Sequence, residues 1–226
     1  MKPPKVSLSE QCMQVGWSLT EVIAQKHDKR LWSMDGGPAA GPEEVVAQMF
    51  RSSGGSVSFC EGGSFLLLMK AAALETLSAR NTFDDRLDAI NRYLEAQMTI
   101  LAEHTAEIVE TVRTISADAL ARNVSELFKS TILTSFYPRV KEAFMLDLFD
   151  QLGRDKLADA LLAFSAAPYY LRAGWPDLTV IQNGKLKLVE VKTSDKLLDS
   201  QLRFATGIAT PMGFDCGVVR LKAQKQ

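Results

Sequence analysis

Two strand-like runs, residues 177–181 and 185–192, flank the dipeptide Asn183-Gly184, and this arrangement leaves few local folds open. Asn-Gly between such runs favours a two-residue type I′ hairpin, because both turn residues tolerate positive φ. In that hairpin Gln182 pairs with Lys185, and counting outward places Asp177 opposite Glu190. We therefore predict an antiparallel hairpin with two carboxylates on one face.

The second run has the pattern of a central strand. Glu190 and Lys192 are two residues apart and share a face with Leu188, whereas Val189 and Val191 point to the other face. A strand that is apolar on both faces is buried, so Glu190 and Lys192 would be partly buried charges that need partners. Two facing carboxylates repel unless something positive lies between them, and a divalent cation meets that need.

These residue types suit phosphodiester hydrolysis. Carboxylates bind Mg²⁺ or Mn²⁺ while leaving water ligands, and the metal polarises a phosphoryl oxygen and activates the attacking water. Lys192 would stabilise the developing negative charge or position the nucleophilic water. An Asp at a strand end and a Glu-x-Lys are also common on protein surfaces, so spacing alone leaves that interpretation open.

The rest of the chain reads mostly as helix. We expect helices over residues 8–30 and 43–51, separated by a Gly/Pro-rich loop at 36–42, and a buried helix over 65–77 with Ser64 as its N-cap. From residue 83 to 162 apolar residues recur at three and four, as in packed helices, with no convincing strand. Glu61 falls in a glycine-lined turn before the buried helix.

After the hairpin, the pattern returns to a helix and then a strand. Thr193, Ser194 or Asp195 is expected to cap a helix that carries Leu198 and Ile208, and residues 217–221 form a last strand.

Composition narrows the class further. The 226 residues carry a net charge of −1, but residues 170–226 hold nine basic and five acidic side chains, the sign that a phosphate-contacting end requires. The three cysteines show no metal-ligand or disulfide spacing, and no apolar run is long enough to span a membrane or act as an export signal. We expect a reducing compartment, either the cytoplasm of a bacterial or phage-like system or a eukaryotic nucleus, and no membrane partner.

Three motifs in order carry a family resemblance: Gly174-Trp175-Pro176-Asp177, Glu190-Val191-Lys192 and Gln201. They resemble the signature of PD-(D/E)XK nucleases, in particular the VRR-NUC branch, and the run from Cys60 to Phe65 resembles the turn that supplies a metal-binding Glu in the Fanconi-associated nuclease family. The chain departs from the family in lacking room for its upstream domains. It also has residues 193–196, Thr-Ser-Asp-Lys, where Gly-Pro is usual.

The resemblance implies a fold and a site. The fold is α/β (α+β), a restriction-endonuclease-like core of αβββαβ topology with a large helical insertion and N-terminal helices. Residues 1–60 would form the N-terminal helical segment and 61–226 the nuclease domain, comprising a first helix (61–80), the insertion (81–165) and the catalytic core (166–226). Glu61, Asp177 and Glu190, with the Val191 carbonyl, would bind metal; Lys192 would be catalytic and Gln201 would support it.

The leading hypothesis is a structure-selective DNA nuclease that uses Mg²⁺ or Mn²⁺ on branched, flapped or single-stranded DNA, at 5′ flaps or 5′ ends, in DNA repair. We expect a monomer because of the large insertion. A Holliday-junction resolvase acting as a dimer, or a non-catalytic nucleic-acid-binding module, remains open.

The histidines and several aromatic residues lie outside these motifs or at their edge, and their patterns favour structural roles. His27 and His104 are interpreted as surface residues on helices. The aromatic residues Tyr169, Tyr170 and Trp175 are more consistent with packing than with stacking on a base.

Overall fold

The computed structural model describes residues 6–34, 36–81, 85–193 and 196–224. Two compact units divide the chain. The first, here called the sheet unit, contains the residues up to Glu61 and those from Gly174 onward. The second, the helical unit, runs from Gly62 to Ala173. The segment before Glu61 therefore belongs with the C-terminal residues instead of standing apart as the predicted N-terminal helical segment.

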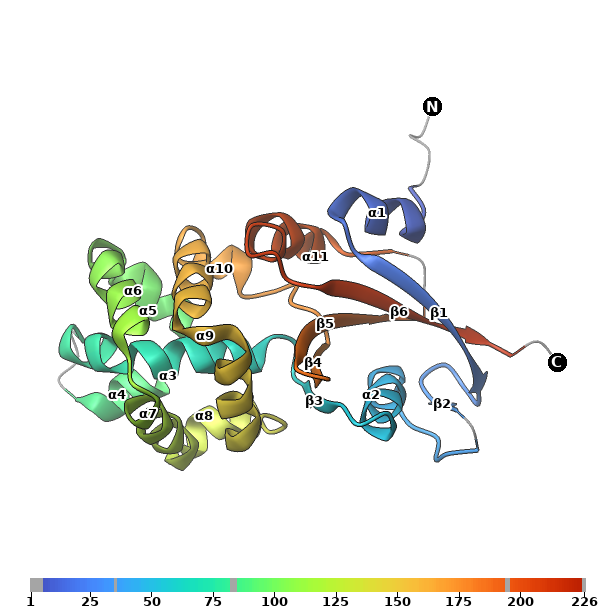
Figure 1. The fold of residues 1–226 in the computed structure, drawn as a ribbon, viewed down its shortest axis with the longest axis horizontal. Coiled ribbons are helices and arrows are strands. Elements are labelled where there is room, and N and C mark those ends of the chain that lie inside the picture. Colours follow the sequence, from blue (N-terminus) through green and yellow to red (C-terminus); the bar gives the residue numbers. More distant parts are fainter. Residues whose placement is uncertain (1–5, 35, 82–84, 194–195, 225–226) are drawn as a thin grey trace. The chain divides into compact units, whose positions relative to one another are not determined.

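The sheet unit is a six-stranded mixed sheet in the order β2-β1-β6-β5-β4-β3 (Figure 1). Its strands are β1 (Ser18–Lys26), β2 (Trp32–Ser33), β3 (Ser56–Phe59), β4 (Leu178–Gln182), β5 (Lys185–Lys192) and β6 (Cys216–Ala223). Its helices are α1 (Leu8–Val15), α2 (Pro42–Ser52) and α11 (Asp199–Phe204), followed by the π-helical turn η2 (Ala205–Ala209).

The predicted hairpin is confirmed. β4 and β5 pair antiparallel, with Gln182 opposite Lys185 and Leu178 opposite Val189. Asn183 and Gly184 have φ values of 52° and 67°, the left-handed conformation that this two-residue turn requires. β5 lies between β4 and β6, so the prediction of a central strand also holds.

The two faces of the sheet are covered by different helices. α2 packs on one face against a core that includes Val189, Val191 and Val219. α1 and α11 lie on the other face, the one that carries Glu190 (Figure 1). On that side the rings of Trp17 and Trp175 both contact Phe204. The alternation along β5 thus separates an apolar layer from a layer that contains charged groups.

The order α2, β3, β4, β5, α11, β6 is the predicted αβββαβ core. β3, β4 and β5 pair antiparallel in succession, and β6 pairs parallel to β5. β1 and β2 extend the sheet beyond β6, and the helical unit is inserted in the chain between β3 and β4.

The predictions for the N-terminal region need correction. The helix expected over residues 8–30 ends at Val15, and residues from Ser18 onward form β1, which pairs parallel to β6. His27 consequently follows a strand, not a helix, and its ring bonds to the Ser33 hydroxyl. The expected helix over 43–51 is confirmed as α2.

Two expected helix caps are wrong. The buried helix α3 (Gly63–Ala79) begins before Ser64, and its N-cap is Gly62, which supplies a left-handed conformation. α11 begins at Asp199 with Leu198 at the N-cap, so Thr193 does not cap it. The other two proposed caps, Ser194 and Asp195, lie outside the described residues.

The described part of the helical unit contains helices and no strand, as predicted. It comprises α3, α4 (Arg86–Asn91), α5 (Leu94–Ile100), the 3₁₀ turn η1 (Ala102–His104), α6 (Thr105–Thr114), α7 (Ala117–Lys129), α8 (Thr131–Phe136), α9 (Glu142–Ser165) and α10 (Pro168–Leu171). α3 is buried around almost its whole circumference, which makes it the central helix of this unit. None of the described helices is long and apolar enough to cross a membrane.

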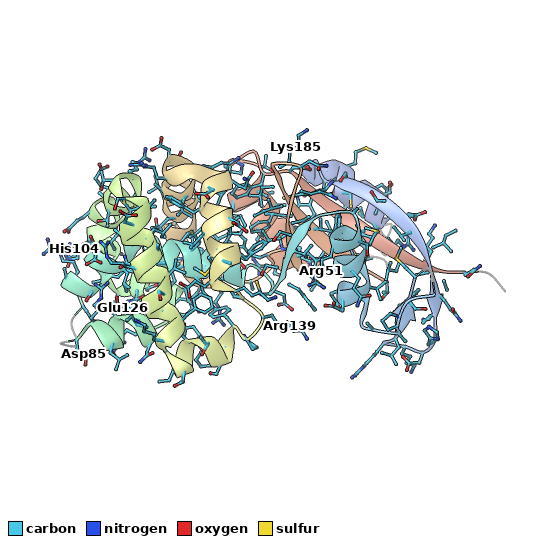
Figure 2. All side chains as sticks on the ribbon, turned by 60° about the horizontal axis from the view of Figure 1, so that its bottom comes forward. Arg51, Asp85, His104, Glu126, Arg139 and Lys185 are labelled. Atoms are coloured by element: carbon cyan, nitrogen blue, oxygen red, sulfur yellow. The ribbon has the colours of Figure 1, made fainter. Side chains whose placement is uncertain are left out.

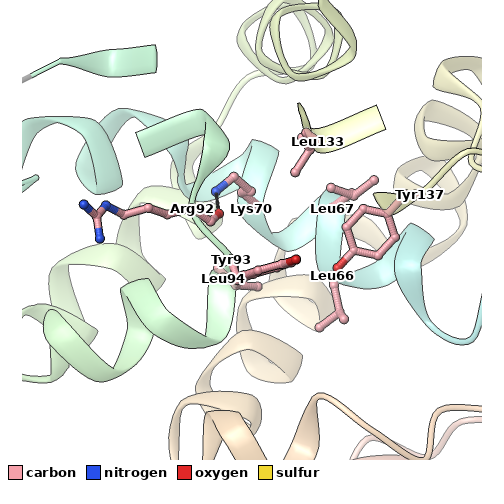
Figure 3. Close-up of a pocket in the computed structure, with 8 residues that line it drawn as sticks. All are labelled: Leu66, Leu67, Lys70, Arg92, Tyr93, Leu94, Leu133 and Tyr137. Atoms are coloured by element: carbon pink, nitrogen blue, oxygen red, sulfur yellow. Dashed lines mark hydrogen bonds between the residues drawn. The ribbon is translucent and has the colours of Figure 1, made fainter. Parts of the chain in front are cut away.

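Among the described residues of the helical unit, two charged side chains are buried, Lys70 and Glu95. Lys70 on α3 is 1% exposed, and its Nζ donates to the carbonyl oxygen of Ala89 and to Oε1 of Gln97. It also donates to the Arg92 carbonyl oxygen (Figure 3). Burial lowers the pKa of Lys70 to about 7. Three acceptors around one nitrogen match the three donors of an ammonium, so the geometry suits the charged form. Lys70 thus fastens α3 to α4 and α5.

Candidate active site

Asp177 stands directly before β4, held there by its backbone. The Asp177 carbonyl accepts from the N–H groups of Cys60 (3.2 Å) and Glu61 (3.4 Å), and its Oδ2 accepts from the Val191 N–H at 2.8 Å. The β4–β5 ladder ends at Leu178, so Asp177 and Glu190 lie just beyond the last pair. They remain neighbours, because the Asp177 carboxyl binds the N–H of Val191, the residue that directly follows Glu190.

Gly174 lets the segment that leads into Asp177 lie close to α11. Its φ is 90°, and a Cβ at this position would lie 2.1 Å from the Ser200 carbonyl oxygen. Any other residue would therefore push the Asp177 segment and α11 apart. Trp175 is buried with its ring 4.5 Å from that of Phe204, which confirms its packing role. In the helical unit Tyr169 and Tyr170 are exposed, so their packing is at the rim and not in the core, and the Arg172 guanidinium lies 5.8 Å from the Tyr169 ring centroid.

Glu190, Lys192 and Gln201 form a closed network. Lys192 Nζ lies 2.7 Å from Glu190 Oε1 and donates to Gln201 Oε1 at 3.0 Å, and Gln201 Nε2 donates to the same Glu190 oxygen. The Leu198 N–H also donates to Gln201 Oε1 at 2.8 Å, which fixes the orientation of the amide. Glu190 and Gln201 are buried, so each partner holds the next in one geometry.

Burial dominates the electrostatics of the carboxylates. Desolvation, followed by the negative charge of Glu190, raises the pKa of Asp177 to about 8. Desolvation also raises the pKa of Glu190, although Lys192 and Gln201 favour its charged form. Glu43, in the first turn of α2, adds a smaller negative contribution at Asp177. At neutral pH the pair therefore retains a proton unless a cation takes its place.

The residues present fit a hard divalent cation. Glu190 Oε2 is buried and has no hydrogen-bond partner among the described residues, and such an orphaned oxygen is costly unless a ligand satisfies it. Carboxylate and carbonyl oxygens are the donors that Mg²⁺ and Mn²⁺ prefer. Within the described ranges, no three Asp, Glu, His or Cys side chains gather closely enough to form a metal-ligand group by themselves.

Glu61 is the predicted ligand that the structure leaves apart from the others. Its backbone is bound at Asp177, but its side chain is exposed. Its φ of 47° is strained for a residue with a side chain, and unlike Asn183 it is not explained by a hairpin turn. Strain of this kind concentrates at functional sites.

Gln11 is a neighbour that sequence reasoning missed. This buried α1 side chain donates to the Leu197 carbonyl at 3.4 Å and accepts from the Leu197 N–H at 2.8 Å. Leu197 comes directly before the α11 N-cap, and α11 carries Gln201. The two residues are separated by 186 positions, and no local pattern marks such a contact.

Comparisons with known proteins support the fold. No protein-family model matches the sequence, and a search of curated proteins gives no match. The crystal structure of paFAN1 bound to 2nt 5′ flap DNA with gap matches the whole chain with a TM-score of 0.69 at 16% identity. The structure with a 1nt 5′ flap matches 92% of the chain at 0.66, also with 16% identity. The chain has the fold of that part of paFAN1. It spans about 40% of the length of that protein, and at this identity the likeness establishes the fold alone.

Proposed function

We propose that this chain is a metal-dependent, structure-selective DNA nuclease that hydrolyses phosphodiester bonds at 5′ flaps or 5′ ends, with a role in DNA repair. The observation that carries the proposal is the Glu190–Lys192–Gln201 network beside Asp177, in which one buried Glu190 oxygen has no partner among the described residues. Buried charges without full satisfaction are costly, and active sites are where such costs occur.

The proposal of a DNA substrate rests on two similarities. The motifs resemble those of the Fanconi-associated nuclease family, and the fold is shared with paFAN1, whose crystal structures hold 5′-flap DNA. Because the chain spans only part of paFAN1, its preference for flaps is a proposal and not a property of the fold.

Each residue has a distinct task in this proposal. Asp177, Glu190, Glu61 and the Val191 carbonyl would hold Mg²⁺ or Mn²⁺, which polarises a phosphoryl oxygen and lowers the pKa of a bound water. Lys192 would donate to a non-bridging phosphoryl oxygen or orient the attacking water. Gln201 would position Lys192 and Glu190, since its amide binds both of them.

The deciding experiment is cleavage of end-labelled 5′-flap, four-way-junction and single-stranded DNA in Mg²⁺, Mn²⁺ or EDTA. Wild type is compared with Asp177→Ala, and Asp215→Ala is the matched control because Asp215 is an exposed carboxylate of the same unit. We expect cleavage in either metal, none in EDTA, loss in Asp177→Ala and wild-type rates in Asp215→Ala.

Other outcomes point to other functions. Preferred cutting of four-way junctions by a dimer would favour a resolvase. Metal-independent binding without cutting of any substrate would favour a non-catalytic module. Cleavage by Asp177→Ala at the wild-type rate would refute the proposed site.

A further inference from the structure

A row of charged residues continues from Lys192 across the sheet. The parallel register places Lys192 of β5 beside Arg220 of β6, and Arg220 beside Glu21 of β1. Paired residues of neighbouring strands point to the same face, so all three lie on the face that carries Glu190. Lys222 shares this face, because it is two residues beyond Arg220 on β6.

The two β6 cations converge on a single anion. Glu21 Oε1 lies 3.5 Å from Nη1 of Arg220, and Glu21 Oε2 lies 2.6 Å from Nζ of Lys222. A guanidinium and an ammonium that meet the two oxygens of one carboxylate have the geometry that also suits two oxygens of a phosphate. Among the described residues of this row beyond Lys192, Arg220 and Lys222 carry two positive charges and Glu21 carries one negative charge.

This part of the face is accessible. The side chains of Glu21 and Lys222 are 42% and 47% exposed, and Ile23, the register partner of Lys222, is 70% exposed. The Arg220 side chain is 27% exposed. Ion pairs that solvent can reach contribute little to stability, so fold stability alone gives a weak reason for two cations to meet here.

The spacing suits a DNA strand that passes through the cleavage centre. Neighbouring strands are about 4.8 Å apart and alternate residues about 6.6 Å apart, so Lys222 lies about 8 Å diagonally from Lys192. One DNA strand carries a phosphate about every 3.4 Å along the helix axis. A strand with its scissile phosphate at Lys192 would therefore bring an internal phosphate to the β6 cations within about two nucleotides.

We propose that Arg220 and Lys222 bind an internal backbone phosphate of the DNA strand next to the cleavage centre, displacing Glu21, which occupies the phosphate position in the free protein. The proposal rests on the proposed function, because DNA is the ligand. It assigns binding and not chemistry to these residues, since neither belongs to the Glu190–Lys192–Gln201 network.

The test measures binding separately from cleavage. Fluorescence anisotropy with 5′-hydroxyl flap DNA in EDTA, between 50 and 200 mM salt, compares wild type with the double variant R220Q/K222Q. The control K185Q/K187Q removes the same charge from the hairpin end of β5, where Figure 2 labels Lys185. The 5′-hydroxyl excludes binding through a terminal phosphate, and added inorganic phosphate tests for a site that accepts the free ion.

We expect R220Q/K222Q to lose about tenfold in affinity, with the slope of log K against log salt reduced by about one to two. The control should lose less than twofold, and 10 mM inorganic phosphate should leave wild-type binding within twofold. Glu21→Gln should bind several-fold more tightly than wild type, and this single exposed substitution provides a second test if the double variant does not fold.

Equal losses in the double variant and the control would overturn the proposal, as would unchanged binding in Glu21→Gln, strong competition by free phosphate, or no binding by wild type. DNA binding that is weakened in R220Q/K222Q but not in the control, without any cleavage by wild type, would refute the nuclease activity and still support the phosphate site.

Discussion

Both units of the molecule bury charged side chains, and Lys70 in one and Glu190 in the other differ in how fully their polar atoms are hydrogen-bonded. In the helical unit, Lys70 directs its ammonium at three acceptors, which match its three donors. In the sheet unit, Glu190 has one oxygen bound by Lys192 and Gln201 and a second, buried oxygen without a partner among the described residues. A satisfied buried charge fixes structure, whereas an unsatisfied one retains binding capacity. The contrast separates a structural charge from a functional one.

Glu190→Gln should give the largest effect and the clearest support for this contrast. The amide removes the desolvated negative charge and keeps an oxygen that can accept from Lys192 and Gln201, so we expect a Tm in EDTA within a few degrees of wild type together with a loss of cleavage of about 10³-fold or more. Thermal denaturation and cleavage are measured on the same preparation. A variant that is destabilised yet still cleaves DNA would show that the Glu190 charge, like that of Lys70, serves structure and not cleavage.

Lys70→Met tests the other side of the comparison. Methionine fills the volume but removes the Lys70 donor from the Ala89 and Arg92 carbonyls and from Gln97 Oε1, which should cost on the order of 3 kcal/mol in unfolding free energy. For a chain of this size, that corresponds to a Tm lower by about 10 °C. Below that temperature the folded variant should cleave at the wild-type rate. A specific loss of cleavage without loss of stability would contradict the structural role.

How far the sequence predicted these two regions depends on the range of the interactions involved. The β4–β5 hairpin was predictable in register because Asn183-Gly184 and the flanking alternation are local signals. The expected helix over residues 8–30 failed beyond Val15, because β1 is set by parallel pairing with β6, about 200 residues later in the chain. Local propensity carries no trace of such a partner.

The residues of the candidate site also differ in how well local sequence signals identify them. Asp177, Glu190, Lys192 and Gln201 were named from their motifs, and the structure brings them together. Gln11 was missed because it acts across the fold, and Glu43 because an acidic residue in a first helical turn ordinarily reflects a favourable dipole contact. Glu61 was named, but its side chain is exposed in this structure and its ligand role stays a prediction.

Asp177→Asn sharpens the comparison through pH. The folded-state pKa of Asp177 is raised above its unfolded value, so the native state holds the proton more tightly. The stability from the protonated carboxyl is complete below about pH 4 and is lost as pH rises toward 8. Asparagine keeps an acceptor for the Val191 N–H without the charge. We expect the variant to gain several degrees in Tm over wild type at pH 8 and almost nothing at pH 4, both in EDTA. A difference that does not vary with pH would contradict the raised pKa.

Gln11→Ala should give the smallest effect and tests whether a fully satisfied buried group can still serve the site. The substitution removes both hydrogen bonds to Leu197 and should cost about 1 to 2 kcal/mol in stability. Because Leu197 leads into α11, Gln201 should hold Lys192 less firmly, and we expect a severalfold lower kcat with little change in KM. Ser9→Ala is the matched control, since Ser9 is an exposed residue on the same helix. If kcat falls no further than in that control, α1 stabilises the sheet unit without positioning its catalytic groups, and the satisfied network around Leu197 belongs with Lys70 as structure alone.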